Sequence, residues 1–366
     1  MADTALGFLR LARTESVGPI TYRRLLARFS GPDEALDALP ALARSGGRAN
    51  PPRIPPMAEV EREYEAVLRL GGVFLFLDQP GYPEYLAALA DAPPAIAVLG
   101  DASLLSSRSI GIVGARNASA NGMRLAAHLA AELAPHLTIV SGLARGIDTA
   151  AHEGAIRGGR TIAVIAGGLD VPYPPENVDL QRRIAENGTV VAEAPLGTAP
   201  IGRHFPKRNR IIAGLTLGLV VIEAAVRSGS LLTARLAVEA GREIFAVPGS
   251  PLDPRARGGN DLLRQGAHLT ETAEDVLTNL PAQRTPPQGF AEPPPLWEDD
   301  PAPEDELFRA RREIPALLGA EPVGVDEIAR RCQLSITSIR AVILELELAG
   351  RAECLAGDKV VLPEDP

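Results

Sequence analysis

The sequence predicts an α/β protein whose core is a parallel sheet, with a small helical domain before it and a winged helix after it. Short β-branched runs alternate with amphipathic stretches from about residue 106 to residue 247. Short helical patterns precede residue 90, and a helix, a helix-turn-helix and a hairpin pattern follow residue 304. The expected divisions are a helical domain over 1–90, an α/β core over 91–280, a linker over 281–303 and a winged helix over 304–366.

Length and composition are those of a folded protein of two or three domains. The chain has 366 residues, of which 46% are hydrophobic and 23% charged, so bulk disorder is excluded. The longest nearly apolar stretch, 211–222, is too short to span a bilayer, and the N-terminus lacks a signal-peptide pattern. We therefore expect no membrane association and a cytoplasmic protein. The only cysteines, Cys332 and Cys354, fit a reducing compartment and are too few for a four-ligand zinc site.

The charge is acidic overall but unevenly distributed. A net charge of −9 argues against a protein coated in basic surface for duplex DNA, although it permits a local basic groove. Residues 106–280 hold 18 Arg and Lys against 16 Asp and Glu, whereas residues 304–366 hold 8 against 13. Any basic nucleic-acid site is therefore expected in the α/β core.

The region before residue 90 reads as short helices separated by turns. Helical spacing covers 22–29, 35–42 and 57–70, and a Val-Gly-Pro turn at 17–20 precedes the first of these. Such a turn between two helices is typical of a helix-hairpin-helix, which binds DNA phosphates through backbone N–H groups. An ordinary turn between helices explains the same residues.

The α/β core delivers glycine-rich or basic loops to one edge of its sheet. Strands are predicted at 110–113, 138–140, 161–165, 189–192, 219–222 and 243–247. In a parallel sheet the carboxyl ends of the strands meet at one edge, where backbone N–H groups and helix N-termini can bind an anion. Taken singly, each loop is equally explained as a tight glycine turn. The candidate contacts in the loops are Arg116, Ser141, Gly142, Arg145, Gly146, Ser228, Gly229 and Ser230.

Residues 203–210 form the most basic run of the chain and include an aromatic residue. Cations that contact phosphates and a ring on which a base stacks are typical of single-strand binding. The candidate contacts are Arg203, Phe205, Lys207, Arg208, Asn209 and Arg210. The alternative places Phe205 in the core and pairs one or more arginines with Glu193 or Glu223. Asn209 is expected to fix the loop by hydrogen bonds.

Signatures of nucleotide-dependent or metal-dependent enzymes are missing from the sequence. The loop after the first strand lacks the G-x-G-x-x-G pattern, and neither lysine lies in a P-loop. No G-x-S-x-G elbow occurs, and the histidines lack H-E-x-x-H spacing. We expect no catalytic residues, no cofactor and no metal.

The C-terminal region combines a linker and a winged helix. Residues 281–303 are rich in proline and acidic residues and contain Trp297, which predicts a semi-extended linker. The second helix of the helix-turn-helix begins near Thr337 and offers Ser335, Ser338 and Arg340 for base reading. Because this domain has a net charge of −5, from 8 basic and 13 acidic residues, we favour a protein-interaction module over a duplex reader.

Several long motifs resemble the DNA-processing protein A family, also called DprA or Smf. They are VGARNAS at 113–119, SGLARGID at 141–148, GGLDVPYPPEN at 167–177, FPKRNRIIAGL at 205–215 and the segment 223–249. The resemblance covers residues 75–280 densely and in the family's order. It implies an extended Rossmann-like core, flanked by a helical domain of sterile-alpha-motif type and a winged helix.

The resemblance also implies a function. Members of the family bind single-stranded DNA, protect incoming strands during natural transformation, and help load the RecA recombinase on strands covered by single-strand-binding protein. Arg116 and the residues from Phe205 to Arg210 would bind DNA. Because Glu176 follows the Tyr-Pro pair at 173–174, that loop supplies no cation. A homodimer is implied, and the candidate positions, which core packing explains equally well, are Leu262, Leu263, Val276 and Leu277.

The sequence disfavours two other functions. Nucleotide phosphoribohydrolases with a Rossmann-like fold carry a P-G-G-x-G-T-x-x-E motif, but residues 227–233 lack its second Gly-Thr and its glutamate. A duplex regulator led by the winged helix is disfavoured by the acidic balance. The sequence therefore favours a single-strand binder that is not an enzyme.

Overall fold

The computed structural model describes residues 2–281, 303–355 and 357–363, which form two compact units. One unit takes in the described residues up to 62, residues 90–94 and the described residues from 303 onward. The other takes in residues 63–89 and the described residues from 95 to 281. The linker predicted over 281–303, with Trp297, lies outside the described residues apart from its two end positions.

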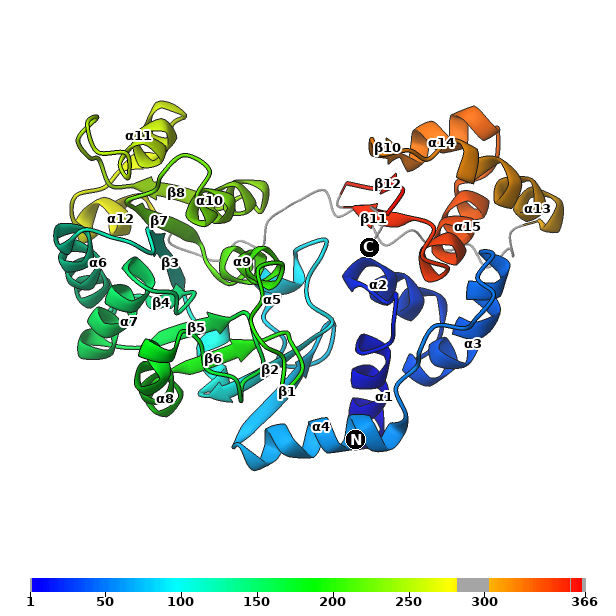
Figure 1. Cartoon of the computed structure of the whole chain (residues 1–366), viewed down its shortest axis with the longest axis horizontal. Coiled ribbons are helices and arrows are strands. Elements are labelled where there is room, and N and C mark those ends of the chain that lie inside the picture. Colours follow the sequence, from blue (N-terminus) through cyan, green and yellow to red (C-terminus); the bar gives the residue numbers. More distant parts are fainter. Residues whose placement is uncertain (1, 282–302, 356, 364–366) are drawn as a thin grey trace. The chain divides into compact units, whose positions relative to one another are not determined.

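The second unit is built on a sheet that, in the described residues, has nine strands in the order β1-β2-β6-β5-β4-β3-β7-β8-β9 (Figure 1). Every neighbouring pair from β6 to β9 is parallel, whereas β1 and β2 extend the sheet with antiparallel pairs. The strands are β1 (Gly72–Phe76), β2 (Ala95–Gly100), β3 (Ser109–Gly114), β4 (Thr138–Ser141), β5 (Thr161–Ile165), β6 (Thr189–Ala192), β7 (Gly218–Ile222), β8 (Glu243–Ala246) and β9 (His268–Leu269). The predicted α/β core with a mostly parallel sheet is confirmed.

The expectation of helices throughout residues 1–90 is wrong at β1. Val73 pairs with Val98 of β2, and the residues of β1 alternate in burial, which is the pattern of a half-buried strand. The pairing partner begins more than twenty residues further along the chain, so a short apolar run gave too little periodicity to separate strand from helix. The antiparallel extension of the sheet follows from this tertiary pairing.

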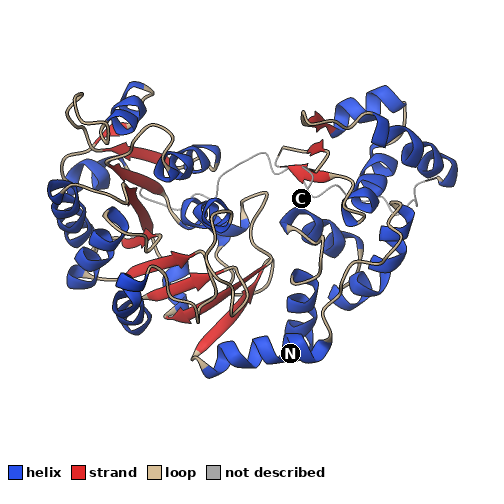
Figure 2. Ribbon diagram, viewed as in Figure 1, coloured by secondary structure: helices blue, strands red, loops and turns tan. Residues whose placement is uncertain are grey.

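Helices lie on the sheet (Figure 2). The apolar side chains between the helices and the sheet are buried. Ile110, Ile112, Leu129, Val220 and Phe245 form part of one continuous core between the sheet and α6. The remaining elements of this unit are α5 (Glu84–Ala87), η1 (Ala102–Ser106), α6 (Ala120–Leu133), α7 (Ile147–Gly158), η2 (Pro175–Asn177), α8 (Val178–Asn187), α9 (His204–Leu215), α10 (Gly229–Glu239), α11 (Arg257–Arg264) and α12 (Ala273–Asn279).

The direction in which the chain winds through the sheet reverses at β3. The connection through α6 leads from β3 to β4 on one side, and the connection through α10 leads from β7 to β8 on the other. In such sheets ligands bind beyond the carboxyl ends of the strands near this reversal. The loops after β3, β4, β5 and β7 therefore lie where a ligand site is expected.

The first unit contains a helical module and the winged helix. The helical module consists of α1 (Ala2–Ala12), α2 (Pro19–Arg28) and α3 (Pro32–Ser45), and α4 (Met57–Arg69) follows it. The winged helix, as predicted, has a helix, a helix-turn-helix and a hairpin around a core that includes Ile328, Ile339 and Val360. Its elements are α13 (Glu304–Glu313), η3 (Ile314–Ala316), β10 (Val323–Gly324), α14 (Val325–Cys332), α15 (Ile336–Leu348), β11 (Glu353–Leu355) and β12 (Lys359–Val361). Among the described residues, no helix is long and apolar enough to cross a membrane.

Candidate nucleic-acid interface

A cation and two aromatic rings meet at the carboxyl edge of the sheet. The guanidinium carbon of Arg116, in the loop after β3, lies 4.7 Å from the ring centroid of Phe205 at the start of α9. The ring of Tyr173, in the segment after β5, lies 5.9 Å from that of Phe205 at an angle of 60°. Arg116 is exposed, Tyr173 is 42% exposed and Phe205 is half-buried. The three side chains, called the platform below, offer a base a stacking face beside a positive charge.

The sequence signal for Tyr173 was weak because its partners lie far away along the chain. In the sequence Tyr173 is part of a Tyr-Pro pair after the strand predicted at 161–165, and the candidate contacts do not include it. A solvent-exposed aromatic ring in a loop at the carboxyl edge was the available hint. Only the fold brings it beside Phe205, which is more than thirty residues further on.

The basic run at 203–210 was expected to form a loop, and this is wrong, because it forms the first turns of α9. Because a helix has 3.6 residues per turn, neighbouring residues of the run point to different faces of α9, some toward the core and some toward solvent. Arg208 and Arg210 are buried, whereas Arg203 and Lys207 are exposed. Neither exposed cation makes an ion pair with any residue that the structure describes, so both charges are available to phosphates.

Arg208 supports the loop after β4 from within the protein. It is 6% exposed, and an added Cβ at Gly142 would lie 1.6 Å from its Nη1 atom, so a side chain at position 142 would force the Arg208 guanidinium to move. Asp148 supplies the nearby negative charge and accepts hydrogen bonds from the backbone N–H groups of Gly142 and Ala144, at 3.2 and 3.3 Å. Burial lowers the pKa of Arg208 to about 10, which leaves the guanidinium charged at neutral pH.

Arg210 and Asn209 also have structural partners. Arg210 is buried and its Nη2 atom lies 2.5 Å from Oε1 of Glu193, so for this arginine the alternative of an internal ion pair is confirmed. The Asn209 side-chain amide donates to the carbonyl of Gly229 at 3.4 Å. This bond ties the start of α10 to α9, as expected of a residue that fixes the loops.

The serines and glycines of the predicted site are mostly engaged by the protein itself. Ser141 is fully buried and its hydroxyl donates to the carbonyl of Ile112 at 2.6 Å. Ser228 caps α10 by accepting from the backbone N–H of Leu231, and Ser230 is 7% exposed. Gly229 is exposed at the N-terminus of α10. Of these four residues, Gly229 is the one that is exposed.

Gly146 and Arg145 shape the loop between β4 and α7. Gly146 has a positive φ of 77°, and an added Cβ would lie 2.3 Å from the carbonyl oxygen of Ala115, so glycine permits close contact with the loop after β3. Arg145 is exposed but pairs with Glu176 at 2.6 Å. The acidic residue that follows the Tyr-Pro pair therefore offsets one of the predicted cations.

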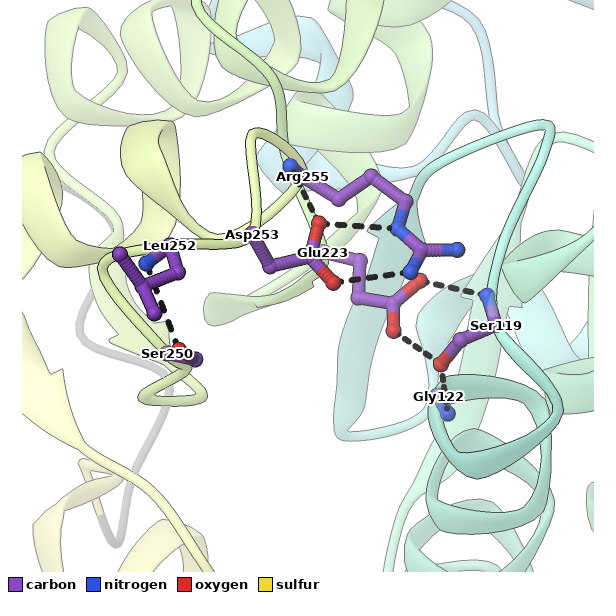
Figure 3. Close-up of polar contacts among 7 residues, drawn as sticks. All are labelled: Ser119, Gly122, Glu223, Ser250, Leu252, Asp253 and Arg255. Carbon is purple, nitrogen blue, oxygen red and sulfur yellow. Dashed lines mark hydrogen bonds and ion pairs between the residues drawn. The ribbon is translucent and has the colours of Figure 1, made fainter.

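A carboxylate occupies the N-terminus of α6, the position where a doubly wound fold holds a phosphate. Glu223, which follows β7, accepts hydrogen bonds from the backbone N–H of Ser119, at 2.8 Å, and from its hydroxyl (Figure 3). An added Cβ at Gly122 would lie 2.6 Å from the carboxylate carbon of Glu223. Asp253 and Arg255, which pair with each other, line or flank the adjoining cleft of about 310 Å³. Within the described ranges no group of His, Cys, Asp and Glu could hold a metal ion.

The fold and this edge define a class, namely Rossmann-like α/β proteins with an exposed cationic and aromatic surface beyond the carboxyl ends of the strands. Comparison with protein families matches residues 73–281 to DNA recombination-mediator protein A. Residues 2–66 match a DprA-like N-terminal HHH domain, and residues 298–358 match a DprA winged helix domain. The chain belongs to the DNA recombination-mediator protein A family.

Individual relatives agree with this assignment. Protein Smf of Escherichia coli is 39% identical over 296 residues, which cover 78% of this chain and 76% of that protein. DNA processing protein DprA of Bacillus subtilis is 47% identical over 203 residues, which cover 55% of this chain and 68% of that protein. The crystal structure of DNA processing protein A from Streptococcus pneumoniae superimposes with a TM-score of 0.68 at 35% identity, covering 77% of this chain and 99% of that one.

A further solved structure carries a description of its ligand. It is DNA processing protein A from Helicobacter pylori, described by its single-stranded DNA binding mode, and it has a TM-score of 0.51 and 30% identity. The comparison covers 56% of this chain and 94% of that one.

Proposed function

We propose that this chain is a single-stranded DNA-binding recombination mediator and that it binds the strand at the platform and the exposed cations beside it. The observation that carries the proposal is the position of Arg116 over the ring of Phe205, with Tyr173 alongside. Aromatic stacking contributes about 1–3 kcal/mol per base and tolerates any sequence. Membership of the family supports the proposal, as does the single-stranded DNA binding mode described for the Helicobacter pylori relative.

The proposed contacts with the sugar-phosphate backbone come from exposed groups. Arg116, Arg203 and Lys207 supply charge, and the N-terminus of α10 at Gly229 supplies backbone N–H groups. Arg208, Asn209 and Arg210 act in this proposal as positioning residues, because they are buried and hold the neighbouring loops. Ser141, Gly142, Gly146, Ser228 and Ser230 shape the same loops.

We propose the family's cellular role for this chain as well. It would protect incoming strands during natural transformation and assist the loading of RecA on strands covered by single-strand-binding protein, without catalysing a reaction. A homodimer would place two platforms on one strand and raise avidity without new contacts. Leu262 and Leu263 on α11 are partly exposed and are the proposed dimer contacts, whereas Val276 is fully buried in the core.

The geometry at α6 argues against the rival of a nucleotide phosphoribohydrolase. In that rival, the N-terminus of α6 would hold the phosphate of a nucleotide. Glu223 already accepts the N–H and O–H of Ser119 there, and its charge repels a phosphate. The proposed ligand is therefore a strand on the outer edge and not a mononucleotide in this cleft.

One titration series separates these functions. Fluorescence anisotropy is measured for the full chain with a labelled single-stranded oligonucleotide, with the same sequence as a duplex, and with unlabelled AMP as competitor. We expect binding to the single strand that is at least tenfold tighter than to the duplex and no displacement by millimolar AMP. Tighter duplex binding, or displacement by AMP, would contradict the proposal.

A further inference from the structure

The second helix of the helix-turn-helix, α15, is buried on more than one face. Ile339, Val342 and Ile343 belong to the core of the winged helix and are fully buried. Leu344 and Leu348 lie outside that core cluster, yet they are 3% and 0% exposed. They are covered because α15 also packs against α2 and α3 of the helical module. A helix that reads a major groove must instead leave a face open to DNA.

The backbones of the two modules approach closely at the end of α3. An added Cβ at Gly46 would lie 2.0 Å from the carbonyl oxygen of Glu345 on α15. Arg48 donates to the carbonyl of Leu348 at 3.3 Å, and Arg351 donates to the carbonyl of Gly46 at 3.2 Å. These bonds satisfy carbonyls at the ends of both helices, which would otherwise be left without partners.

Arg24 of α2 joins the helical module to the wing. Its Nη1 atom lies 2.8 Å from the sulfur of Cys354 in β11, and its Nη2 atom lies 3.3 Å from Asp358 in the hairpin turn. Asp358 also pairs with Arg340 of α15 at 2.7 Å. Arg340 is the cation in the half of α15 that would face bases, so this network removes its charge from a groove reader's surface.

The N-terminus of α15 is occupied by another carboxylate of the winged helix. Glu306 of α13 accepts from the backbone N–H and the hydroxyl of Ser335, at 3.1 and 2.6 Å, and from the hydroxyl of Ser338, at 2.7 Å. In a DNA reader these two serines would face phosphates or base edges. Of the first turn, Ile336 and Thr337 remain exposed.

We propose that the winged helix uses its recognition helix as a protein-docking surface whose partner is the α2–α3 hairpin of the same chain, and that while docked it does not read duplex DNA. The two modules, although separated by more than 230 residues in the sequence, act as one folded unit. This inference stands apart from the proposed single-strand binding, because it concerns only the other unit.

The first test is the protection of a thiol in the full chain. Cys332 and Cys354 both belong to the core of the winged helix, and Cys354 also accepts a hydrogen bond from Arg24 of the helical module, at 2.8 Å. Burial raises the pKa of the Cys354 thiol to about 12. Gly46→Ala adds the methyl group that has no room against Glu345, and Gly319→Ala makes the same change where nothing lies within 4 Å. Modification by a disulfide reagent is followed for each cysteine by peptide mass spectrometry.

We expect Cys354 to react at least tenfold faster in Gly46→Ala than in the parent chain, with Cys332 slow and Gly319→Ala unchanged. Arg24→Ala removes the contacts of Arg24 with Cys354 and Asp358 without adding a larger side chain. This variant should also increase the reactivity of Cys354 and leave that of Cys332 unchanged. The docking would be overturned if Cys354 reacted as slowly in Gly46→Ala and Arg24→Ala as in the parent chain. It would also be overturned if Cys332 and Cys354 became equally reactive in these two variants.

The second test concerns DNA reading. Thr337→Glu places a negative charge on the exposed first turn of α15. If the recognition helix is a docking surface, duplex affinity of the full chain stays within twofold of the parent. A loss of tenfold or more would show that α15 reads duplex DNA and would overturn the proposal.

Discussion

Removal of the exposed cations beside the platform should change the salt dependence of strand binding by a calculable amount. Arg116, Arg203 and Lys207 are exposed and pair with no carboxylate among the described residues, so each can neutralise a phosphate. Each phosphate contact to a single strand contributes about 0.7 to the slope of log affinity against log salt. The triple variant with alanine at these positions should therefore have a slope smaller by about 2.

The slope translates into a measurable difference in affinity. When salt is raised from 50 to 200 mM, both chains bind more weakly. With a slope smaller by about 2, the factor by which affinity falls should be roughly 16–18 times smaller for the variant than for the parent chain. The assay is fluorescence anisotropy of a labelled oligothymidine at four or more salt concentrations. At the lowest salt the variant should also bind more weakly, because its favourable release of counterions is smaller.

A buried arginine supplies the matched control. Arg210 is 7% exposed and pairs with Glu193, so Arg210→Gln should lower the melting temperature and leave the salt slope unchanged. An unchanged slope in the triple variant would refute the assignment of these cations to phosphates. So would an equal change of slope in a folded Arg210→Gln chain.

Further predictions concern the supports of the site and the second unit. Gly142→Ala should destabilise the core unit by about 1–3 kcal/mol in chemical denaturation, because the methyl group collides with Arg208; an unchanged midpoint would refute this contact. Burial lowers the pKa of His152 to about 3, so the unfolded chain takes up its proton first; stability is present above pH 6.5 and falls by up to about 1.4 kcal/mol per pH unit as the pH decreases below that value. Thermal melts between pH 7 and pH 5 test this, and His152→Gln should flatten the dependence. Burial raises the pKa of Glu347, so its contribution is favourable below the ordinary value of 4.5 and is lost as the pH rises through the folded value; Glu347→Gln should stabilise the chain by about 1 kcal/mol at pH 7, and a lower melting temperature there would contradict it. A chain that ends at residue 280 should keep its single-strand affinity within about threefold, under roughly 0.7 kcal/mol; a tenfold loss with the sheet still folded by circular dichroism would place the winged helix on the DNA.

The parallel core was predictable because each of its strands can be recognised from its own local sequence, without knowledge of its pairing partner. Residues 161–165 are a short β-branched run bounded by glycines and arginine on one side and glycines on the other, and β5 spans the predicted residues. The winged helix was predictable for the same reason, since the expected helix-turn-helix after residue 304 is formed by α14 (Val325–Cys332) and α15. β1 and β2 were missed because each depends on pairing with a distant strand.

The side on which each cation lies was not predictable, because it depends on the conformation of the basic run. Pro206 lies within the run, and proline is tolerated in the first turn of a helix because the N–H that it lacks would have no intrahelical partner there. α9 begins at His204, and its periodicity then buries Arg208 and exposes Lys207. The sequence therefore predicted the residue types of the site. Which of these side chains face solvent and which face the core could be decided only once the run was known to form a helix.

The pairings across the edge were also beyond the sequence. Arg145 meets Glu176, and Tyr173 meets Phe205, through loops that follow different strands. Each pairing requires the order of strands in the sheet, which the sequence pattern did not give. The parallel arrangement of the strands predicts that these loops lie at one edge of the sheet. It does not predict which loops contact each other.

Photochemical crosslinking tests the location of the strand most directly. A single-stranded oligonucleotide carrying 5-iodouracil is bound to the full chain and irradiated, and the crosslinked peptides are identified by mass spectrometry. The account predicts adducts at Phe205 and Tyr173, whose rings form the exposed platform, and their loss when Arg116 and Lys207 are replaced by alanine. Adducts confined to the helical module or the winged helix, with none at these two rings, would contradict it.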